Sequence, residues 1–354
     1  MNLLTLGWCE RFAQPFEPYR AEGLVPARVS AEHRGAVRLL FEDGERDGVA
    51  AGRLRHRAAS RVDLPAVGDW VAARAPEGDG PAVIEAILPR ASAFVRRAAG
   101  NATGEQVVAA NVDVVFLVSG LDGDFNPRRI ERGVALAWES GARPVVVLNK
   151  ADLCADVAAR VAEIEAVAPG VEVRAATTVT GDGLETFNVH LRSGVTGALL
   201  GSSGVGKSTI INRLAGREVV RTSAVRADDD RGRHTTTHRE LFVLPGGGLI
   251  IDTPGFRELG MWGAGTGVAE AFADLGDLGA RCRYRDCRHE AEPGCAVRAA
   301  VEAGTLPAER LESYHRLLRE LRHVEARVDQ RAALEEKRRW RSIHQLARRF
   351  RPRT

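Results

Sequence analysis

The chain has 354 residues, 44% of them hydrophobic, and a formal net charge of +3 at pH 7. Length and composition indicate two or three domains with proper hydrophobic cores. Apolar runs long enough to span a membrane are absent from the sequence, and Trp8 to Arg11 stand where a signal peptide would need an apolar stretch. We therefore expect a cytoplasmic protein with reduced cysteines.

Short strand-like runs occupy the chain between residues 24 and 90, separated by Asp43-Gly44 and by the stretch Glu77 to Gly80. Such closely spaced runs favour a small β-barrel. The runs are Ala27 to Ser30, Gly35 to Phe41, Gly48 to Leu54, Asp69 to Ala73 and Ala82 to Leu88.

A basic cluster lies in what we expect to be a strand-to-loop stretch of this barrel. Around His56 stand Arg53, Arg55, Arg57 and Arg61. The cluster suits contact with phosphate groups. A solvated charged face explains the same composition equally well.

A buried parallel strand is predicted at Arg143 to Leu148, where β-branched residues dominate. The strand ends in Asn149, Lys150, Ala151 and Asp152. The Asp152 carboxylate can accept the hydrogens on guanine N1 and N2, which adenine does not offer. This motif therefore predicts a guanine-binding site.

A second base-contacting loop is expected at Thr177-Thr178-Val179-Thr180-Gly181. Nucleotide-binding proteins of this kind usually have Ser-Ala-x there, which backs the guanine with a main-chain N–H. Thr177 stands at the serine position and Thr178 at the alanine position, so the match to the pattern is partial.

A phosphate-binding loop matches G-x-x-x-x-G-K-[ST]. The apolar run Val195 to Leu200 precedes it, and a helical stretch begins at Thr209, which disfavours the alternative of a flexible surface loop. Lys207 would reach the β and γ phosphates, and Ser208 would bind Mg²⁺. The nucleotide-binding residues are Gly201, Ser202, Ser203, Gly204, Val205, Gly206, Lys207, Ser208 and Thr209.

Two further phosphate-sensing segments follow. A short apolar strand runs into Asp252-Thr253-Pro254-Gly255, where Asp252 can hold Mg²⁺ through water and the Gly255 N–H can contact the γ phosphate. In the preceding polar stretch, Asp228 to Thr237, one threonine would complete the Mg²⁺ site, and Thr236 represents the three candidates Thr235 to Thr237. Phe256 stands where many GTPases place a water-positioning Gln, which predicts slow intrinsic hydrolysis.

A compact metal-ligand pattern follows the nucleotide motifs. Cys282, Cys287, His289 and Cys295 form a Cys₃His set with the spacing of a structural zinc site. The alternative is three buried thiols and a surface histidine. Cys9 and Cys154 stand apart, and we expect them to be reduced thiols without a role.

Beyond this pattern, Pro307 to Glu336 carries apolar residues at helical spacing, which predicts one amphipathic helix. Leu311, Tyr314, Leu318 and Leu321 belong to that stripe. Residues 337 to 354 hold eight Lys or Arg and no acid, with Trp340 and Phe350 among them. This tail suits RNA, whereas a disordered solubilising tail is the competing interpretation.

The nucleotide motifs occur in an unusual order, because the base-reading motif precedes the phosphate loop. That order indicates a circularly permuted GTPase, and the motifs resemble those of the RsgA (YjeQ) family. The resemblance extends to Gly68 to Val71, to Glu105 to Asp113 and to His289 to Cys295, and it covers nearly the whole chain.

The resemblance implies a multidomain α/β protein: an OB-fold barrel, a circularly permuted P-loop GTPase domain and a mainly helical zinc domain. We assign residues 1–23 to an N-terminal extension, 24–98 to the barrel, 99–262 to the GTPase domain, 263–336 to the zinc domain and 337–354 to the basic tail. The resemblance also makes His234, in the switch segment, a candidate catalytic residue. His234 as a simple polar loop residue remains an equal alternative.

The function that the resemblance implies is hydrolysis of GTP to GDP on the 30S ribosomal subunit and its 16S rRNA, late in subunit maturation. Zn²⁺ and Mg²⁺ are the expected cofactors, and we expect a monomer with no membrane partner. Two alternatives stay open. One is an RNA-binding module in which guanine nucleotide sets only the conformation, and the other is a signalling GTPase without an RNA role.

Overall fold

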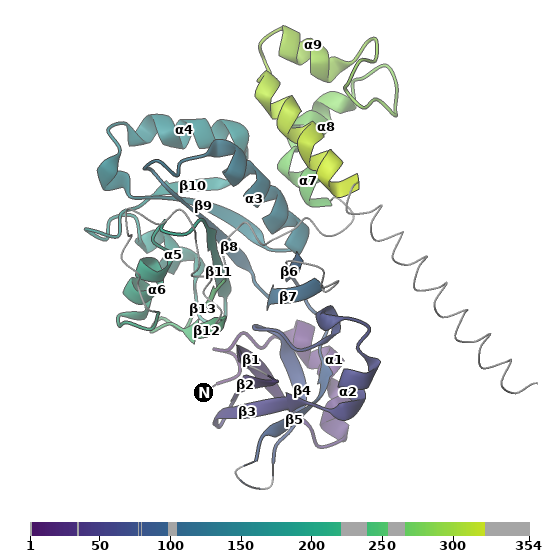
Figure 1. Cartoon of the computed structure of the whole chain (residues 1–354), viewed down its shortest axis with the longest axis vertical. Coiled ribbons are helices and arrows are strands. Elements are labelled where there is room, and N and C mark those ends of the chain that lie inside the picture. The colour runs from purple at the N-terminus through teal and green to yellow at the C-terminus, as the bar shows by residue number, and fades with distance from the viewer. Residues whose placement is uncertain are drawn as a thin grey trace, which may run out of the picture. The chain divides into compact units, whose positions relative to one another are not determined.

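The computed structural model describes residues 2–33, 35–76, 78, 80–97, 105–220, 239–253 and 266–322 (Figure 1). The chain forms two compact units, Met1–Gly260 and Met261–Thr354. Several predicted features lie outside the described residues: His234 and Thr235 to Thr237, Gly255 with Phe256, and the basic tail. Across the described ranges, every helix is too short or too polar to cross a bilayer.

The predicted N-terminal barrel is confirmed. Its strands pair in the order β1-β2-β3-β5-β4, and β4 returns to pair with β1, which closes the sheet on itself. Alternate side chains fill the interior, among them Val29, Leu39, Val71 and Ile84. The strands are β1 Val25–His33, β2 Ala36–Phe41, β3 Gly44–Ala50, β4 Trp70–Arg74 and β5 Ala82–Ile87.

The basic stretch of the barrel differs from the prediction. Strand β3 ends at Ala50, which pairs with Ile84, and the helix α2 Gly52–Arg57 begins two residues later. The prediction of one strand from Gly48 to Leu54 was therefore wrong, because the partner strand gives no register beyond Ala50. Arg53, Arg55 and Arg57 lie on that helix instead of on a strand edge, and Arg61 begins the 3-10 turn η1 Arg61–Asp63.

The residues before the barrel pack on it. Helix α1 Glu10–Ala21 buries Phe12 and Phe16, and the rings of Trp8 and Trp70 meet edge to face with centroids 4.8 Å apart. Aromatic burial of this size stabilises the attachment by several kcal/mol, at about 25 cal/mol per Å² of apolar surface. The predicted N-terminal extension is thus part of the first unit.

The nucleotide-binding domain is a mostly parallel sheet in the order β10-β9-β8-β11-β13-β12. Figure 1 shows helices α3 and α4 on one side of these strands and α5 and α6 on the other. The central strands β8, β9, β11 and β13 are nearly continuous apolar runs, as burial on both faces requires, whereas the outer strands of the domain, β10 and β12, also carry exposed residues. They are β8 Val114–Gly120, β9 Arg143–Asn149, β10 Glu172–Ala175, β11 Thr196–Gly201, β12 Glu240–Val243 and β13 Leu249–Asp252; the helices are α3 Pro127–Ser140, α4 Val157–Val167, α5 Glu185–His190 and α6 Lys207–Ala215.

The strand order places a topological switch point between β8 and β11. From β8 the chain moves outward through β9 to β10, and it then returns to β11 and moves the other way to β13. Ligands of such sheets bind at the carboxyl ends of the strands beside this point. The loops that follow β8, β9, β11 and β13 therefore form the candidate site.

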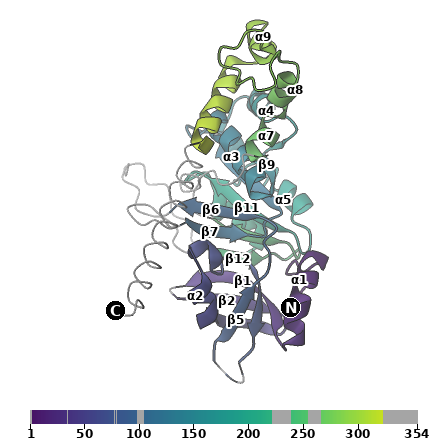
Figure 2. The same ribbon diagram turned by 90° about the vertical axis from the view of Figure 1, so that its right-hand side faces the viewer.

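The barrel and the nucleotide-binding domain share one sheet. Strand β1 pairs with β12 through Ala31 and Glu240, so barrel and domain strands form a continuous sheet of 11 strands. Beside this pairing, Arg239 and Gln106 both contact the carboxylate of Glu32, at 3.1 and 3.0 Å. The hairpin of β6 Ala93–Arg97 and β7 Glu105–Ala110 connects the two parts along the chain (Figure 2).

The second unit is helical. Its elements are α7 Thr266–Ala271, α8 Ala273–Gly279, α9 Ala296–Glu302 and a helical stretch at 308–322, the described part of the predicted amphipathic helix. Leu317 and Leu321 form its buried face, whereas Leu318 is only partly buried, a shift from the predicted stripe. Arg310 joins this helix to α8 through a two-pronged contact with Asp274 at 2.6 Å.

Candidate nucleotide site and metal centre

The phosphate loop connects β11 to α6, as predicted. Gly204 and Gly206 adopt positive φ of 80° and 99°, which glycine tolerates and other residues rarely do. Helix α6 begins at Lys207, so its free N–H groups face the loop. The Lys207 ammonium donates to the carbonyls of Gly201 and Ser202 at 2.9 and 2.7 Å, and Ser208 and Thr209 lie in the first helical turn.

The base-reading motif meets the other end of this loop. The Asn149 side chain is fully buried and its Nδ2 donates to the Val205 carbonyl at 2.7 Å. A Cβ at Gly206 would lie 2.4 Å from that Nδ2, so a glycine is required there. The Asn149 Oδ1 is buried and, within the described residues, has no hydrogen-bond partner. An unpaired buried oxygen beside the phosphate loop is suited to a ligand.

The Thr177 loop lies against the base-reading motif. The Thr177 hydroxyl donates to the Asp152 carboxylate at 2.5 Å and accepts from the Val179 N–H at 3.2 Å. Thr178 also lies near the phosphate loop, since its hydroxyl would be 4.0 Å from a Cβ at Gly206. The threonine at the usual serine position thus orients the carboxylate that would read guanine.

Asp252 ends β13 and is 7% exposed. Burial raises the pKa of its carboxyl to about 6, although the nearby Lys207 opposes the rise. Burial likewise lowers the pKa of Lys207, opposed by Asp252 and Asp124. The two acids favour the charged ammonium against burial, and a charged lysine beside a glycine loop can receive the negative charge of a phosphate.

Three site residues escaped the sequence interpretation: Asp122 and Asp124, in the loop after β8, and Arg129 on α3. Lys150 Nζ pairs with Asp122 Oδ2 at 2.5 Å; burial would raise the pKa of this carboxyl, but the Lys150 ammonium holds it below its ordinary value. Arg129 Nη1 pairs with Asp124 and donates to the Ser202 hydroxyl. Their position after a buried strand could have identified the acids, because parallel strands end at one edge of the sheet.

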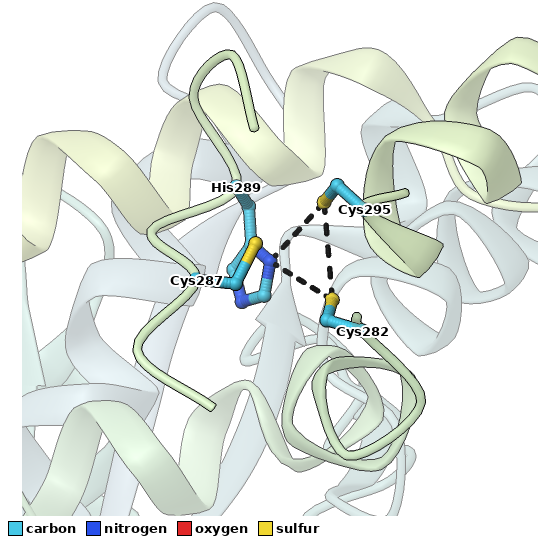
Figure 3. A group of neighbouring side chains, drawn as sticks. All are labelled: Cys282, Cys287, His289 and Cys295. Carbon is cyan, nitrogen blue, oxygen red and sulfur yellow. Dashed lines mark hydrogen bonds between the residues drawn. The ribbon is translucent and has the colours of Figure 1, made fainter. Parts of the chain in front are cut away.

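The predicted metal ligands come together in the second unit. Figure 3 shows the side chains of Cys282, Cys287, His289 and Cys295 pointing toward one another, and their ligand atoms all lie within 4.8 Å of one another. His289 Nδ1 is 3.6 Å from Cys282 Sγ and 3.4 Å from Cys295 Sγ, and these two sulfur atoms are 3.9 Å apart.

These distances fit a tetrahedral zinc ion. Bond lengths of about 2.3 Å to sulfur and about 2.0 Å to nitrogen imply ligand separations of about 3.8 Å between sulfurs and about 3.5 Å between sulfur and nitrogen. Burial lowers the pKa of His289, which favours the neutral, metal-binding imidazole. The Cys282 sulfur also accepts from the Ala296 N–H at 3.3 Å, as a thiolate ligand would.

The comparisons with known proteins agree with this geometry. Residues 87–262 match the family model described as RsgA GTPase. The chain is 51% identical to a protein of Opitutus terrae named small ribosomal subunit biogenesis GTPase RsgA, over 98% of this chain and 96% of that protein. The chain belongs to the RsgA GTPase family. A relative of the same name in Syntrophotalea carbinolica is 46% identical over 99% and 98% of the two chains.

Solved structures extend the RsgA assignment to the fold. YjeQ from Thermotoga maritima is similar with a TM-score of 0.62 at 28% identity, over 84% of this chain and 98% of that chain. YloQ, described as a circularly permuted GTPase, has a TM-score of 0.59 at 25% identity, over 85% and 96%. The predicted RsgA resemblance and the permuted fold are both confirmed.

Proposed function

We propose that this member of the RsgA family binds the 30S ribosomal subunit and hydrolyses GTP to GDP and phosphate during late maturation of that subunit. The observation that carries the nucleotide part is the contact of Asn149 with Val205, which joins a guanine-reading motif to a phosphate loop. The ribosomal part rests on the relatives, which are named for small ribosomal subunit biogenesis.

Each site residue has a proposed role. Asp152, oriented by Thr177, reads guanine, while Asn149, Lys150 and Thr178 line the base. The main-chain N–H groups of Gly201 to Ser208 cradle the phosphates and Lys207 neutralises their charge. Ser208 and Asp252, with Thr236 of the switch segment, would hold Mg²⁺. That ion would draw charge from the β and γ phosphate oxygens during hydrolysis.

Slow intrinsic turnover is part of the proposal. Phe256 has no polar atom to position water, so the group that orients the attacking water comes from elsewhere. His234 is the candidate within the chain, and the bound subunit would order it. Gly255 would donate its N–H to the γ phosphate in the same state.

The barrel is the proposed contact for 16S rRNA. Arg55 and Arg57 of helix α2 are exposed. Neither makes an ion pair with another described residue, whereas Arg53 is paired with Glu85 at 3.1 Å. Two exposed guanidinium groups on one short helix suit an RNA backbone. The basic tail from residue 337 would add a second contact.

We further propose that the Cys₃His cluster holds one structural Zn²⁺, because all four tetrahedral positions are taken by protein ligands. We also propose that the protein acts as a monomer in the cytoplasm, where small subunits mature. GTP and GDP are its small-molecule ligands.

GTP turnover, compared with ATP turnover, tests this function in the absence and presence of purified 30S, 50S and 70S particles. We expect GTP turnover to rise strongly with 30S alone, and Lys207→Ala to abolish it. If GTP turnover were the same with and without each particle, the result would favour the alternative of an RNA-binding module in which hydrolysis is incidental. Equal use of GTP and ATP would contradict the guanine site itself.

A further inference from the structure

The nucleotide site has a phosphate end and a base end that the contacts define. At the start of the phosphate loop, the Lys207 ammonium binds the carbonyls of Gly201 and Ser202. At its far end, Val205 binds Asn149 of the guanine-reading motif. Because the lysine of such loops reaches the β and γ phosphates, Ser202 marks the side of the site where the γ phosphate would lie.

An arginine of helix α3 reaches this phosphate end. Arg129 Nη1 donates to the Ser202 hydroxyl and to Asp124 Oδ1. Its main-chain N–H binds the capping side chain of Asn126 at 3.1 Å, so the first turn of α3 is fixed. The guanidinium is therefore held by an acid and by the phosphate loop, and the main chain that carries it is fixed by the helix cap.

The rest of this guanidinium is available to a ligand. Its Nε and Nη2 make no hydrogen bond with any described residue, and the Arg129 side chain is 35% exposed. Asp124 also raises the pKa of Lys207 against the lowering that burial causes, which places the acid within electrostatic range of that ammonium. Arg129 and Lys207 thus share one acid and one loop residue, Ser202.

We propose that Arg129 is a further phosphate-binding residue of the site, which donates to γ-phosphate oxygens and makes the protein prefer GTP to GDP. Asp124 orients the guanidinium and leaves two of its nitrogens free for the phosphate. Arginine suits this role because its planar fork offers several donors to one phosphate group. This inference rests on the proposed GTPase function and names a determinant of its substrate preference.

A purely structural brace is the competing account of the same contacts. If Arg129 only held the phosphate loop through the Ser202 hydroxyl, removal of Arg129 would weaken the binding of GDP and of GTP equally. Ser202→Ala would then reproduce the effect of Arg129→Ala. A phosphate-binding Arg129 instead affects the triphosphate selectively, because GDP lacks the oxygens that it contacts.

The test is the dissociation constant for GDP and for a non-hydrolysable GTP analogue, measured with the full-length protein and Mg²⁺. We expect Arg129→Ala to weaken binding of the analogue by about tenfold or more and binding of GDP by about twofold or less, since a hydrogen bond to a charged group is among the stronger ones. Arg129→Lys should restore part of the difference, because it keeps the charge. Ser202→Ala should weaken the binding of GDP and of the analogue by the same factor.

Arg174→Ala is the matched control, because Arg174 is also an exposed arginine paired with a carboxylate, Glu172 at 3.0 Å. It should leave both constants unchanged. Equal weakening of GDP and the analogue by Arg129→Ala, or no weakening of either, would overturn the assignment of Arg129. A wild-type protein that binds neither guanine nucleotide would instead contradict the proposed function, so the two failures are distinguishable.

Discussion

The guanidinium of Arg28, on the first barrel strand, donates to the hydroxyl of Thr196, the first residue of β11, at 2.7 Å. It also donates to the carbonyls of Gly68 and Asn111, at 3.3 and 3.2 Å. The side chain is 1% exposed, and burial lowers its pKa to about 10. Strand β11 leads directly into the phosphate loop, so one buried cation connects the barrel to the strand that carries the nucleotide site.

Replacement of Arg28 by Met should therefore destabilise the first unit strongly. The substitution leaves several buried carbonyls without their donor, and we expect a loss of about 3 kcal/mol in the free energy of unfolding. Urea unfolding of the full chain measures it. Arg38→Ala is the control, since this 41%-exposed arginine makes surface ion pairs worth at most about 1 kcal/mol. Similar midpoints for the two variants would show that the buried cation does not stabilise the junction.

Asp252 should make the nucleotide-free protein less stable as pH rises. Its carboxyl has a pKa of about 6, above the ordinary 3.8, so the folded state favours the protonated form. The protonated carboxyl stabilises the folded state fully below about pH 4, and this stabilisation is lost as pH rises through about 6. The resulting cost at pH 8 is on the order of 3 kcal/mol.

The variant Asp252→Asn cannot ionise and should unfold at higher urea concentration than wild type at pH 8, with a difference about one third as large at pH 4.5. The same variant should lose Mg²⁺-dependent GTP binding. Asp47→Asn, at a 59%-exposed side chain, controls for the change of charge. A pH-independent difference between Asp252→Asn and wild type would contradict the raised pKa.

Thr177→Ala should weaken the binding of guanine nucleotides without changing the preference between GTP and GDP. The variant removes the donor to Asp152, a hydrogen bond worth about 1 kcal/mol or somewhat more, and so raises both dissociation constants about five- to tenfold. Titration with each nucleotide measures this. Thr180→Ala, whose hydroxyl binds Asp182 at 2.6 Å, should have no effect. If Thr177→Ala instead reduced GTP binding alone, Thr177 would act at the phosphate end.

Removal of metal should unfold the second unit and leave the first intact. We expect one zinc per chain by metal analysis, lost after treatment with a strong chelator or in Cys295→Ser, together with part of the helical signal of residues 266–322. The guanine-nucleotide affinity of the first unit should persist. Cys154→Ser should keep the full metal content. A stoichiometric metal in Cys295→Ser would show that Cys295 is not a ligand.

The sequence alone was sufficient for the motifs whose chemistry is local. The phosphate loop, Asn149 to Asp152 and the Cys₃His spacing each place their ligands within a few residues, so their composition and order indicate the permuted GTPase and the metal cluster. The barrel could also be predicted, because its strands are short and the turns that separate them are visible in the local sequence.

Only the tertiary structure decided features that join distant segments. Helix α2 takes the place of the predicted end of the strand, since β3 pairs with β5 only as far as Ala50, and this register is not visible in the local sequence. Arg129 reaches Ser202, 73 residues away, because β8 and β11 are neighbours at the switch point. Arg28 meets Thr196 across 168 positions. Local composition carries no record of such contacts, since they depend on which strands the folded sheet places side by side.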